Sequence, residues 1–267
     1  MFSTAKDLAI AGKSILNSTL LSQAQTSRWL KPLTHTSNPK NSVGAPWVIY
    51  SGGEYPNSSL VDVYTVLSNE GYKESLYSSY LGLVPDYGLG YAILSADTKQ
   101  AADLNAHADA VDSVLRAVVT MAVEQAMQNF GGPWKASGSS NSSIKISYDK
   151  YPGIFIEEFV SNGTNFLDTL SSLTGVKKTK DMSVRLYPTH SAVSGGYTKQ
   201  AFRAVFQDKS ELADNNTPTC VSWLDLDKFE YNGAGLDEFI FTLDRSGKAF
   251  MLDVPALDLK LKSAGKA

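Results

Sequence analysis

Residues 77–95 read YSSYLGLVPDYGLGYAILS, two apolar runs joined by Pro85-Asp86. Pro-Asp is a turn signal, because proline presets its own backbone dihedral and aspartate bonds to the backbone that follows. The two runs therefore predict adjacent antiparallel strands over Tyr77–Val84 and Tyr87–Ser95. Two earlier runs have the same strand-like composition, Pro46–Tyr50 and Ser59–Leu67. Together these runs predict an antiparallel meander in which each strand pairs with the next.

A long helix is predicted to pack on this sheet. Apolar residues recur at spacings of three and four from about Thr98 to Gln128, namely Leu104, Ala108, Val111, Leu115, Val118, Ala122 and Ala126. This spacing makes one apolar stripe along a helix. Asp97 is expected as the N-cap, and Gly131-Gly132-Pro133 ends the helix. Upstream, residues 4–16 predict a helix capped by Thr4, and residues 22–30 predict a second helix.

The pattern changes after residues 135–144, which are rich in serine and glycine and are expected to form a linker. Short β-type runs then alternate with Asn-Gly and Gly-Gly turn signals, and only residues 165–173 look helical. The runs are Ile144–Tyr148, Gly153–Val160, Ser183–Tyr187, Ala201–Phe206, Phe239–Leu243, Ala249–Val254 and Leu257–Leu261. We therefore predict an α+β protein, with a sheet and its long packing helix over residues 1–134 and a mainly antiparallel β domain over residues 145–267.

The composition excludes several classes of partner. The 267 residues include 24 Lys and Arg and 27 Asp and Glu, so nothing indicates a nucleic-acid partner. No apolar run approaches the roughly 18 residues that span a bilayer. The three histidines lack the spacing of a zinc site, so no metal or cofactor is expected; they are His35, His107 and His190. A small acidic group could attract a cation but reads equally as a solvated strand face, Asp225, Asp227 and Glu238.

The sequence leaves the cellular compartment open. A single cysteine, Cys220, cannot form an internal disulfide. The first residues, MFSTAKD, lack the apolar region of a signal peptide. Five N-glycosylation sequons matter only if the chain enters the secretory route, at Asn17, Asn57, Asn141, Asn162 and Asn215.

Several stretches carry a family resemblance through their order and spacing. The first is FSTAKDLA at residues 2–9, which is similar to the Ser-Thr-x-x-Asp-Leu-Ala helix start of serine β-lactamase-like proteins. The others are WLKPLTHTS (29–37), SVGAPW (42–47), PDYGLGY (85–91), VRLYPT (184–189), FRAVF (202–206) and LDEF (236–239). Over about residues 2–262 the chain resembles the C-terminal part of fungal proteins related to class C β-lactamases and penicillin-binding proteins. The second half resembles their extra C-terminal β domain.

The resemblance implies a serine hydrolase or acyl-transfer activity on amide or ester substrates. In the family, a Ser-x-x-Lys pair provides the activated nucleophile, and a Tyr-x-Asn provides a second proton-transfer group. A Lys-Ser/Thr-Gly box on a strand edge adds a cation and an oxyanion-hole N–H. The first two motifs lie before the point where this chain begins, so we expect a truncated and inactive form, a pseudoenzyme.

The third box is altered and leaves alternatives open. It should follow Val63-Tyr64-Thr65, but the sequence there is Val66-Leu67-Ser68. Val66 cannot provide a cation, and Ser68 replaces the glycine. One interpretation is relaxed selection or a mispredicted gene segment. The other is an altered substrate, with Lys73 in the role of the missing lysine.

Two short matches to the catalytic motifs also occur within the chain. Ser3-Thr4-Ala5-Lys6 matches Ser-x-x-Lys, and Tyr55-Pro56-Asn57 matches Tyr-x-Asn. The simpler interpretation is a helix cap and a loop turn, because Ser3 belongs to a motif from another place in the fold. The catalytic candidates are therefore Ser3, Lys6, Ser68 and Lys73.

The resemblance also implies a partner and a location. The sheet of residues 1–134 would be incomplete, and the N-terminal half of the family or a homologous subunit would complete it. Secretion is implied by the family alone. An alternative function is a non-catalytic module in which the C-terminal β domain binds a ligand or a partner protein.

Overall fold

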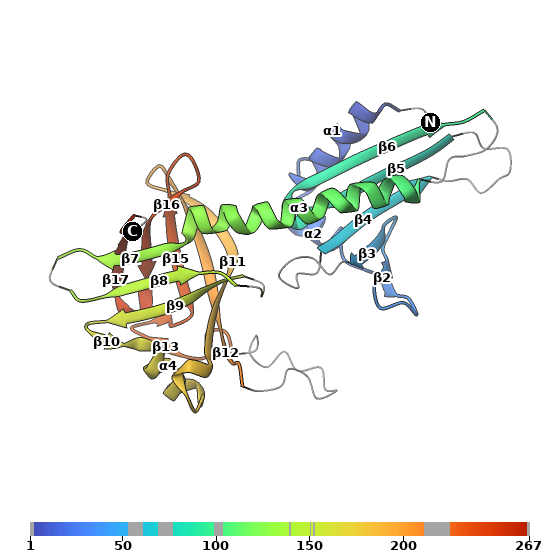
Figure 1. The fold of residues 1–267 in the computed structure, drawn as a ribbon. Helices are drawn as coiled ribbons and strands as arrows, with labels where there is room; N and C mark the ends of the chain where they lie inside the picture. Colours follow the sequence, from blue (N-terminus) through green and yellow to red (C-terminus); the bar gives the residue numbers. More distant parts are fainter. Residues whose placement is uncertain are drawn as a thin grey trace. The chain divides into compact units, whose positions relative to one another are not determined.

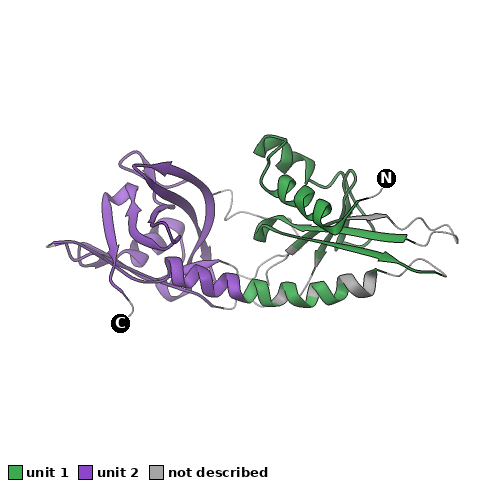
Figure 2. Cartoon of the chain, turned by 90° about the horizontal axis from the view of Figure 1, so that it is seen from above, with its two compact units in different colours: residues 1–120 green, residues 121–267 purple. Residues whose placement is uncertain are grey.

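A computed structural model describes residues 3–52, 61–68, 77–98, 104–138, 140–149, 151, 153–210 and 225–265. The chain divides into two compact units, unit 1 (residues 1–120) and unit 2 (residues 121–267), which Figure 2 colours separately. The helices and antiparallel sheets confirm the predicted α+β class.

Unit 1 contains a six-stranded antiparallel sheet, counted over the described residues, in which each strand pairs with the next along the chain. Its strands are β1 (Thr34–His35), β2 (Asn41–Val43), β3 (Val48–Gly52), β4 (Val61–Ser68), β5 (Tyr77–Val84) and β6 (Leu89–Ala96). The predicted meander is confirmed, and the Pro-Asp turn is the short 3-10 helix η2 (Pro85–Tyr87). Residues 34–35 and 41–43 extend this sheet, because β1 pairs with β2 and β2 pairs with β3.

Two short helices cover one face of this sheet. Helix α1 (Ala5–Leu16) has the predicted N-cap, since the Thr4 side chain accepts a hydrogen bond from the Asp7 N–H. Helix α2 (Gln23–Trp29) starts with a reciprocal capping box between Ser22 and Gln25. The core on this face consists of buried residues from the end of α2 and from the sheet. They are Leu30, Trp47, Ile49 and Leu83.

The long helix α3 (Asn105–Phe130) packs on the opposite face. Its Leu115 and Val119 contact Val63 and Val84 in a buried cluster. Neighbouring strand residues point to opposite faces, so Val63 and Val84 lie on the other side from their neighbours Tyr64 and Leu83. The helix begins at Asn105 rather than near Thr98, so the prediction that Asp97 caps it is wrong.

Unit 2 is built around a closed antiparallel barrel, labelled from β7 to β17 in Figure 1. Within the described residues the strand order is β10-β9-β11-β12-β15-β16-β17-β7-β8, and β8 also pairs with β9, which closes eight strands into a ring. The strands are β7 (Gly132–Ala136), β8 (Ser143–Ser147), β9 (Ile154–Ser161), β10 (Thr164–Asn165), β11 (Met182–Ser194), β12 (Tyr197–Asp208), β15 (Glu238–Leu243), β16 (Ala249–Val254) and β17 (Leu259–Ser263). The remaining elements are β13 (Glu230–Tyr231), β14 (Ala234–Gly235), α4 (Phe166–Thr174), η3 (Thr179–Asp181) and η4 (Pro255–Leu257).

Side chains fill the barrel. Trp134, Phe159, Phe239 and Phe241 are fully buried in one cluster with aliphatic residues from the strands and with Leu170 of α4. The rings of Trp134 and Phe241 meet edge to face, with centroids 5.5 Å apart. Edge-to-face contact is a preferred geometry for aromatic pairs. The interior is therefore a packed core.

The strand boundaries differ from the prediction at the start of unit 2. Residues 135–144, expected as a linker, contribute to β7 and β8, which pair through Trp134 and Ile144. The division into compact units falls at residue 120, within α3, and the predicted domain boundary at residue 134 stays a prediction. Strands β11 and β12 extend further than expected and meet at Gly195-Gly196, where both glycines have positive φ. Two consecutive residues with positive φ are what a tight two-residue hairpin loop requires.

Candidate functional site

The literal Ser-x-x-Lys match lies at the start of α1. Ser3 precedes the N-cap, and Lys6 belongs to the first turn of the helix. Both residues are exposed. The N-cap is Thr4, whose hydroxyl donates to the Asp7 carboxylate at 2.8 Å while it accepts from the Asp7 N–H at 3.1 Å. The local geometry is that of a capped, solvent-exposed helix start.

The altered third box lies on β4. Val66, Leu67 and Ser68 pair with β5, and Ser68 lies opposite Ser79. The side chains of these three residues lie outside the described part of the structure. Lys73, Tyr55 and Asn57 also fall outside the described residues. Of the four catalytic candidates, the described part of the structure places the side chains of Ser3 and Lys6 alone, so a grouping with Ser68 and Lys73 stays a prediction.

Two carboxylates and a tyrosine form a titratable cluster in unit 1. Burial and the nearby charge of Asp62 raise the pKa of Asp86. Burial, Asp62 and Asp86 likewise raise the pKa of Tyr64. Both effects favour the neutral forms, because burial and negative neighbours oppose a further negative charge. This cluster lies on β4 and η2, and it was not singled out from the sequence.

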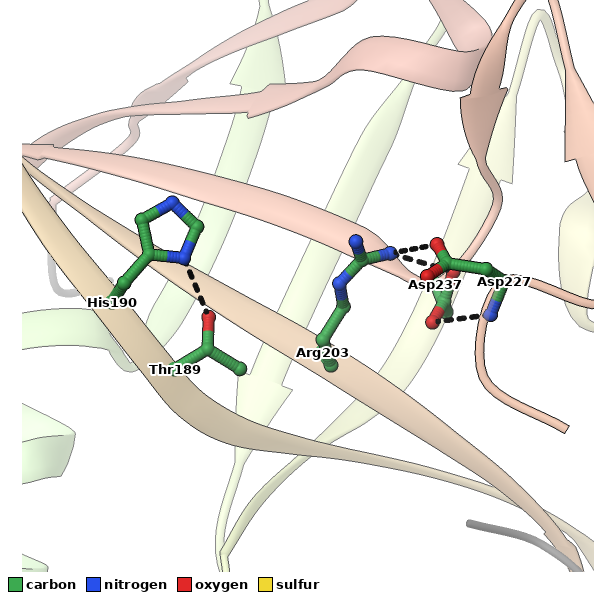
Figure 3. Close-up of polar contacts among 5 residues, drawn as sticks. All are labelled: Thr189, His190, Arg203, Asp227 and Asp237. Atoms are coloured by element: carbon green, nitrogen blue, oxygen red, sulfur yellow. Dashed lines mark hydrogen bonds and ion pairs between the residues drawn. The ribbon is translucent and has the colours of Figure 1, made fainter. Parts of the chain in front are cut away.

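A second polar cluster, the Arg203 cluster, lies on the barrel and comprises Arg203, Asp227 and Asp237 (Figure 3). The Arg203 Nη1 donates to Asp227 Oδ1 at 2.5 Å and to Asp237 Oδ1 at 3.1 Å. The Asp237 carboxylate is almost fully buried, and it also accepts from the Asp227 N–H. Burial alone would lower the pKa of Arg203, but the charges of Asp237 and Asp227 outweigh it and raise that pKa.

Two members of the acidic group noticed in the sequence, Asp225 and Asp227, have cationic partners. Asp227 pairs with Arg203, and Asp225 pairs with Lys228 at 3.1 Å. These carboxylates are thus neutralised by cations of the chain. No group of three His, Cys, Asp or Glu residues with the arrangement of a metal site occurs within the described ranges.

His190 lies on β11 beside Thr189 (Figure 3). The Thr189 hydroxyl lies 3.5 Å from His190 Nδ1 and donates to the Ala201 carbonyl at 3.2 Å. Both residues fall where the register of β11 and β12 shifts, between Pro188 and Ser191. His190 is exposed, so the contact positions an exposed ring and does not build an enclosed base.

A third cluster surrounds Arg185, whose side chain is buried on β11. Its guanidinium pairs with Asp149 at 2.5 Å and lies over the rings of Tyr151 and Phe155. Burial would raise the pKa of Asp149, but hydrogen bonds from Arg185 and from the Tyr151 N–H outweigh it and lower that pKa. Arg185 thereby fixes the loop between β8 and β9.

Sequence reasoning missed the roles of Arg185, Arg203 and Asp237. All three lie in the stretches VRLYPT, FRAVF and LDEF, which carried the resemblance. An arginine inside an alternating apolar strand was the available signal, because a charge there needs a partner once the strand is buried. The partners come from segments far apart in sequence, so their identity required the fold.

Comparisons with known proteins find similarity over unit 2 and over nearly the whole chain. A family model described as "Beta-lactamase-like-like, C-terminal domain" matches residues 122–265, nearly all of unit 2. The "Beta-lactamase-like protein" of Arthroderma benhamiae is 24% identical over 295 aligned residues, which cover 96% of this chain and 47% of that protein. No solved structure matches the chain significantly. No helix among the described residues has the length and apolar character needed to cross a membrane.

Two further relatives have names that state an activity. The "Probable hydrolase M10" of a Phoma species is 25% identical over 183 residues, covering 66% of this chain and 29% of that protein. The "Probable hydrolase clz13" of Cochliobolus lunatus is 25% identical over 186 residues, covering 66% of this chain and 28% of that protein. The chain thus spans about half the length of the Arthroderma relative and less than a third of the other two.

Proposed function

Because the chain belongs to the family of beta-lactamase-like proteins and corresponds to its C-terminal part, we propose that it is the non-nucleophilic portion of a serine hydrolase acting on amide or ester bonds. Two relatives named as hydrolases support a family-level relation to hydrolysis. By resemblance, Ser-x-x-Lys and Tyr-x-Asn belong to the part of the family that this chain does not cover. We propose that the chain alone does not hydrolyse these substrates.

The observation that supports this proposal best is the setting of Ser3 and Lys6. An activated serine needs a base held against its hydroxyl, in a site from which water can be excluded. Both residues are exposed at the start of a helix whose capping bonds are made by Thr4 and Asp7. Nothing in this arrangement raises the reactivity of the Ser3 hydroxyl above that of an ordinary surface serine.

The altered box on β4 extends the proposal. By resemblance, β4 is the strand that would carry Lys-Ser/Thr-Gly, and Val66-Leu67-Ser68 provides no cation there. An altered substrate with Lys73 as the cation is the competing proposal. The two differ in one respect: only the second gives Lys73 a role in binding or turnover.

Turnover assays test the proposal. The full chain is mixed with a chromogenic β-lactam and, separately, with a p-nitrophenyl ester, alongside the variants Ser3→Ala, Lys73→Ala and Ser68→Ala. We expect hydrolysis at the rate of buffer for all four proteins. Turnover by the parent chain that any one variant abolishes would overturn the proposal and identify the catalytic group.

We also propose that the sheet of unit 1 takes further strands from the N-terminal half of the family or from a homologous subunit. Unit 1 exposes large apolar side chains on α1, in the segments on either side of α2, and along β2 and β3; they are Ile10, Leu20, Leu21, Leu33, Val43, Val48 and Tyr50. Where such exposed apolar groups form one contiguous patch, they are typical of a surface that meets another polypeptide.

A binding module on unit 2 is the second candidate function. The packed barrel interior leaves the outer surface for such a role. Tyr148 and Tyr151 are both about half exposed beside the Arg185 cluster, and exposed tyrosines are enriched at binding surfaces. Loss of binding in a double Tyr148→Ala/Tyr151→Ala variant, in a screen with the full chain, would support it; a full chain that binds nothing would exclude it.

Secretion and N-glycosylation remain part of the proposal. Of the five sequons, Asn17, Asn141 and Asn162 are exposed, and Asn57 and Asn215 lie outside the described residues. Asn162 occupies a tight turn with positive φ between β9 and β10. We expect enzymatic deglycosylation of chain recovered from a fungal culture medium to lower its mass, with Asn162→Gln removing one glycan. Chain that is absent from the medium would contradict secretion.

A further inference from the structure

Lysines gather on the outer surface of the barrel, where β16, β17 and β7 lie side by side (Figure 1). Lys262 of β17 lies directly opposite Lys135 of β7. Lys260 shares the outer face with Lys262, because side chains two positions apart on a strand point the same way. Lys248 immediately precedes β16. All four side chains are exposed, and we call this group the lysine face.

The lysine face does not stabilise the barrel. Like charges directly opposite each other in a sheet are destabilising, as Lys262 and Lys135 are. Lysine protects the open edges of sheets, but β17 and β7 each have a paired neighbour on both sides. Within the described ranges none of the four lysines makes an ion pair, although the half-buried Asp253 lies opposite Lys260. Packing and ion pairing therefore leave this positive charge unexplained.

Two exposed aromatic rings lie beside the lysine face. Tyr197 of β12 and Phe250 of β16 meet with ring centroids 5.3 Å apart, and they are 50% and 36% exposed. Along the chain, Phe250 lies between Lys248 and Met251, and Met251 is opposite Lys262. An exposed aromatic pair is thus flanked by cations on the same part of the barrel.

We propose that the lysine face and the Tyr197–Phe250 pair form a docking surface for a membrane that contains anionic phospholipids. Lysines near such a membrane are attracted to its negative surface potential. Aromatic rings settle at the boundary between head groups and acyl chains, and a tyrosine keeps its hydroxyl in water there. This role goes beyond the proposed hydrolase function and uses none of its candidate residues.

The residue types favour a membrane over other anionic partners. Protein–protein interfaces are depleted in lysine and enriched in arginine, whereas the lysine face contains lysine alone. Arginine is also the usual residue for bidentate recognition of a single phosphate, and lysine is a point charge that needs no fixed geometry. A diffuse layer of head groups matches the second kind of contact. The net charge of −3 for the whole chain is unlike that of a nucleic-acid-binding protein.

Co-sedimentation of the full chain with lipid vesicles tests this surface. One set of vesicles is phosphatidylcholine alone, and the other also contains phosphatidylserine. We expect binding to the anionic vesicles only, and weaker binding at high salt. The double variant Lys135→Gln/Lys262→Gln should raise the dissociation constant at least about tenfold. Phe250→Ser should also weaken binding but should keep the dependence on salt.

A matched control separates the lysine face from the overall charge of the chain. Lys177→Gln/Lys178→Gln removes the same charge at two exposed positions between α4 and η3, next to a helix that packs on β9 and β11. We expect this variant to bind like the parent, and circular dichroism verifies that each variant is folded.

Three results would overturn the docking surface. They are a parent chain that does not bind anionic vesicles, equal weakening by the two double lysine variants, and binding of polyphosphate in solution without binding of vesicles. The last result would assign the lysine face to a soluble polyanion. The turnover assays above are independent, because they use soluble substrates and leave the lysine face unchanged.

Discussion

Individual ion pairs in unit 2 differ in how much they stabilise the fold, because their carboxylates differ in exposure. The Asp237 side chain is 4% exposed, and its negative charge is compensated by Arg203. The side chains of Asp225 and Lys228 are both exposed to solvent. Removal of one partner of a buried pair leaves an uncompensated charge. An exposed pair loses little, because water replaces the partner.

We therefore predict different effects from two similar substitutions. Arg203→Met should lower the free energy of unfolding by about 3 kcal/mol, and Lys228→Met by less than about 1 kcal/mol. Urea unfolding of the full chain, followed by fluorescence, measures both. The additional change Asp237→Asn should recover part of the loss in the Arg203→Met background. Equal effects of the two single substitutions would contradict the role of the Arg203 cluster.

The Arg185–Asp149 pair makes stability depend on pH. The pKa of Asp149 is lowered in the folded state, from about 3.9 in an unfolded chain. Its ionisation therefore stabilises the fold above about pH 4, and this contribution is lost as the pH falls through the lower, folded-state pKa. Asp149→Asn should be less stable than the parent at about pH 6, and the difference should vanish in strong acid.

A substitution at Asp86 serves as a control, because its effect on stability should change with pH in the opposite direction. Its pKa is raised by burial and by Asp62, so its ionisation opposes folding as the pH rises through the folded-state pKa. Asp86→Asn should therefore be more stable than the parent at about pH 6, and this gain should shrink below about pH 4. Urea midpoints measured at several pH values follow both variants. A pH-independent gap for Asp149→Asn would show that Asp149 contributes only by packing.

At the scale of elements, the sheet of unit 1 depends on a close approach between β5 and β6. A Cβ atom on Gly82 would overlap the ring of Tyr91, which lies directly opposite. Tyr91 also stacks on Tyr80 with centroids 5.6 Å apart, so the ring cannot move without losing that contact.

Gly82→Ala should therefore destabilise the chain by about 1–3 kcal/mol, the usual effect of overpacking. Gly44→Ala is the matched control, since its Cβ would meet Trp47 at an ordinary 3.4 Å and its backbone needs no positive φ. We expect less than about 1 kcal/mol for the control, measured by urea unfolding. A Gly82→Ala variant as stable as Gly44→Ala would mean that Tyr91 has another position open to it.

The elements that sequence predicted well are those that local signals define. Thr4 and the Ser22–Gln25 capping box set the starts of α1 and α2, and Pro85 separates β5 from β6. Residues 135–144 were misread because serine and glycine dominate them. Trp134 and Ile144, which flank or end that segment, are 1% exposed and hold it in the barrel. Barrel closure depends on the pairing of β8 with β9, which the local sequence pattern does not encode.

At the scale of the whole molecule, the resemblance identified the family and its C-terminal part, and the comparisons confirm both. The polar clusters were harder to predict. Arg185 and Asp149 are 36 residues apart in sequence, and Arg203 and Asp237 are 34 apart. Neither spacing follows the period of a helix or a strand, so the partners of each pair come together only in the folded barrel. The catalytic candidates Ser3, Lys6, Ser68 and Lys73 stay predictions.

The central proposal is that this chain belongs to a serine hydrolase family but provides no nucleophile of its own. A serine hydrolase forms a covalent acyl intermediate with its substrate. The most direct test is therefore the intact mass of the full chain after incubation with a β-lactam. We predict the unmodified mass. A mass raised by that of one whole β-lactam, since ring opening releases no leaving group, and not raised in the Ser3→Ala or Ser68→Ala variant, would contradict the proposal.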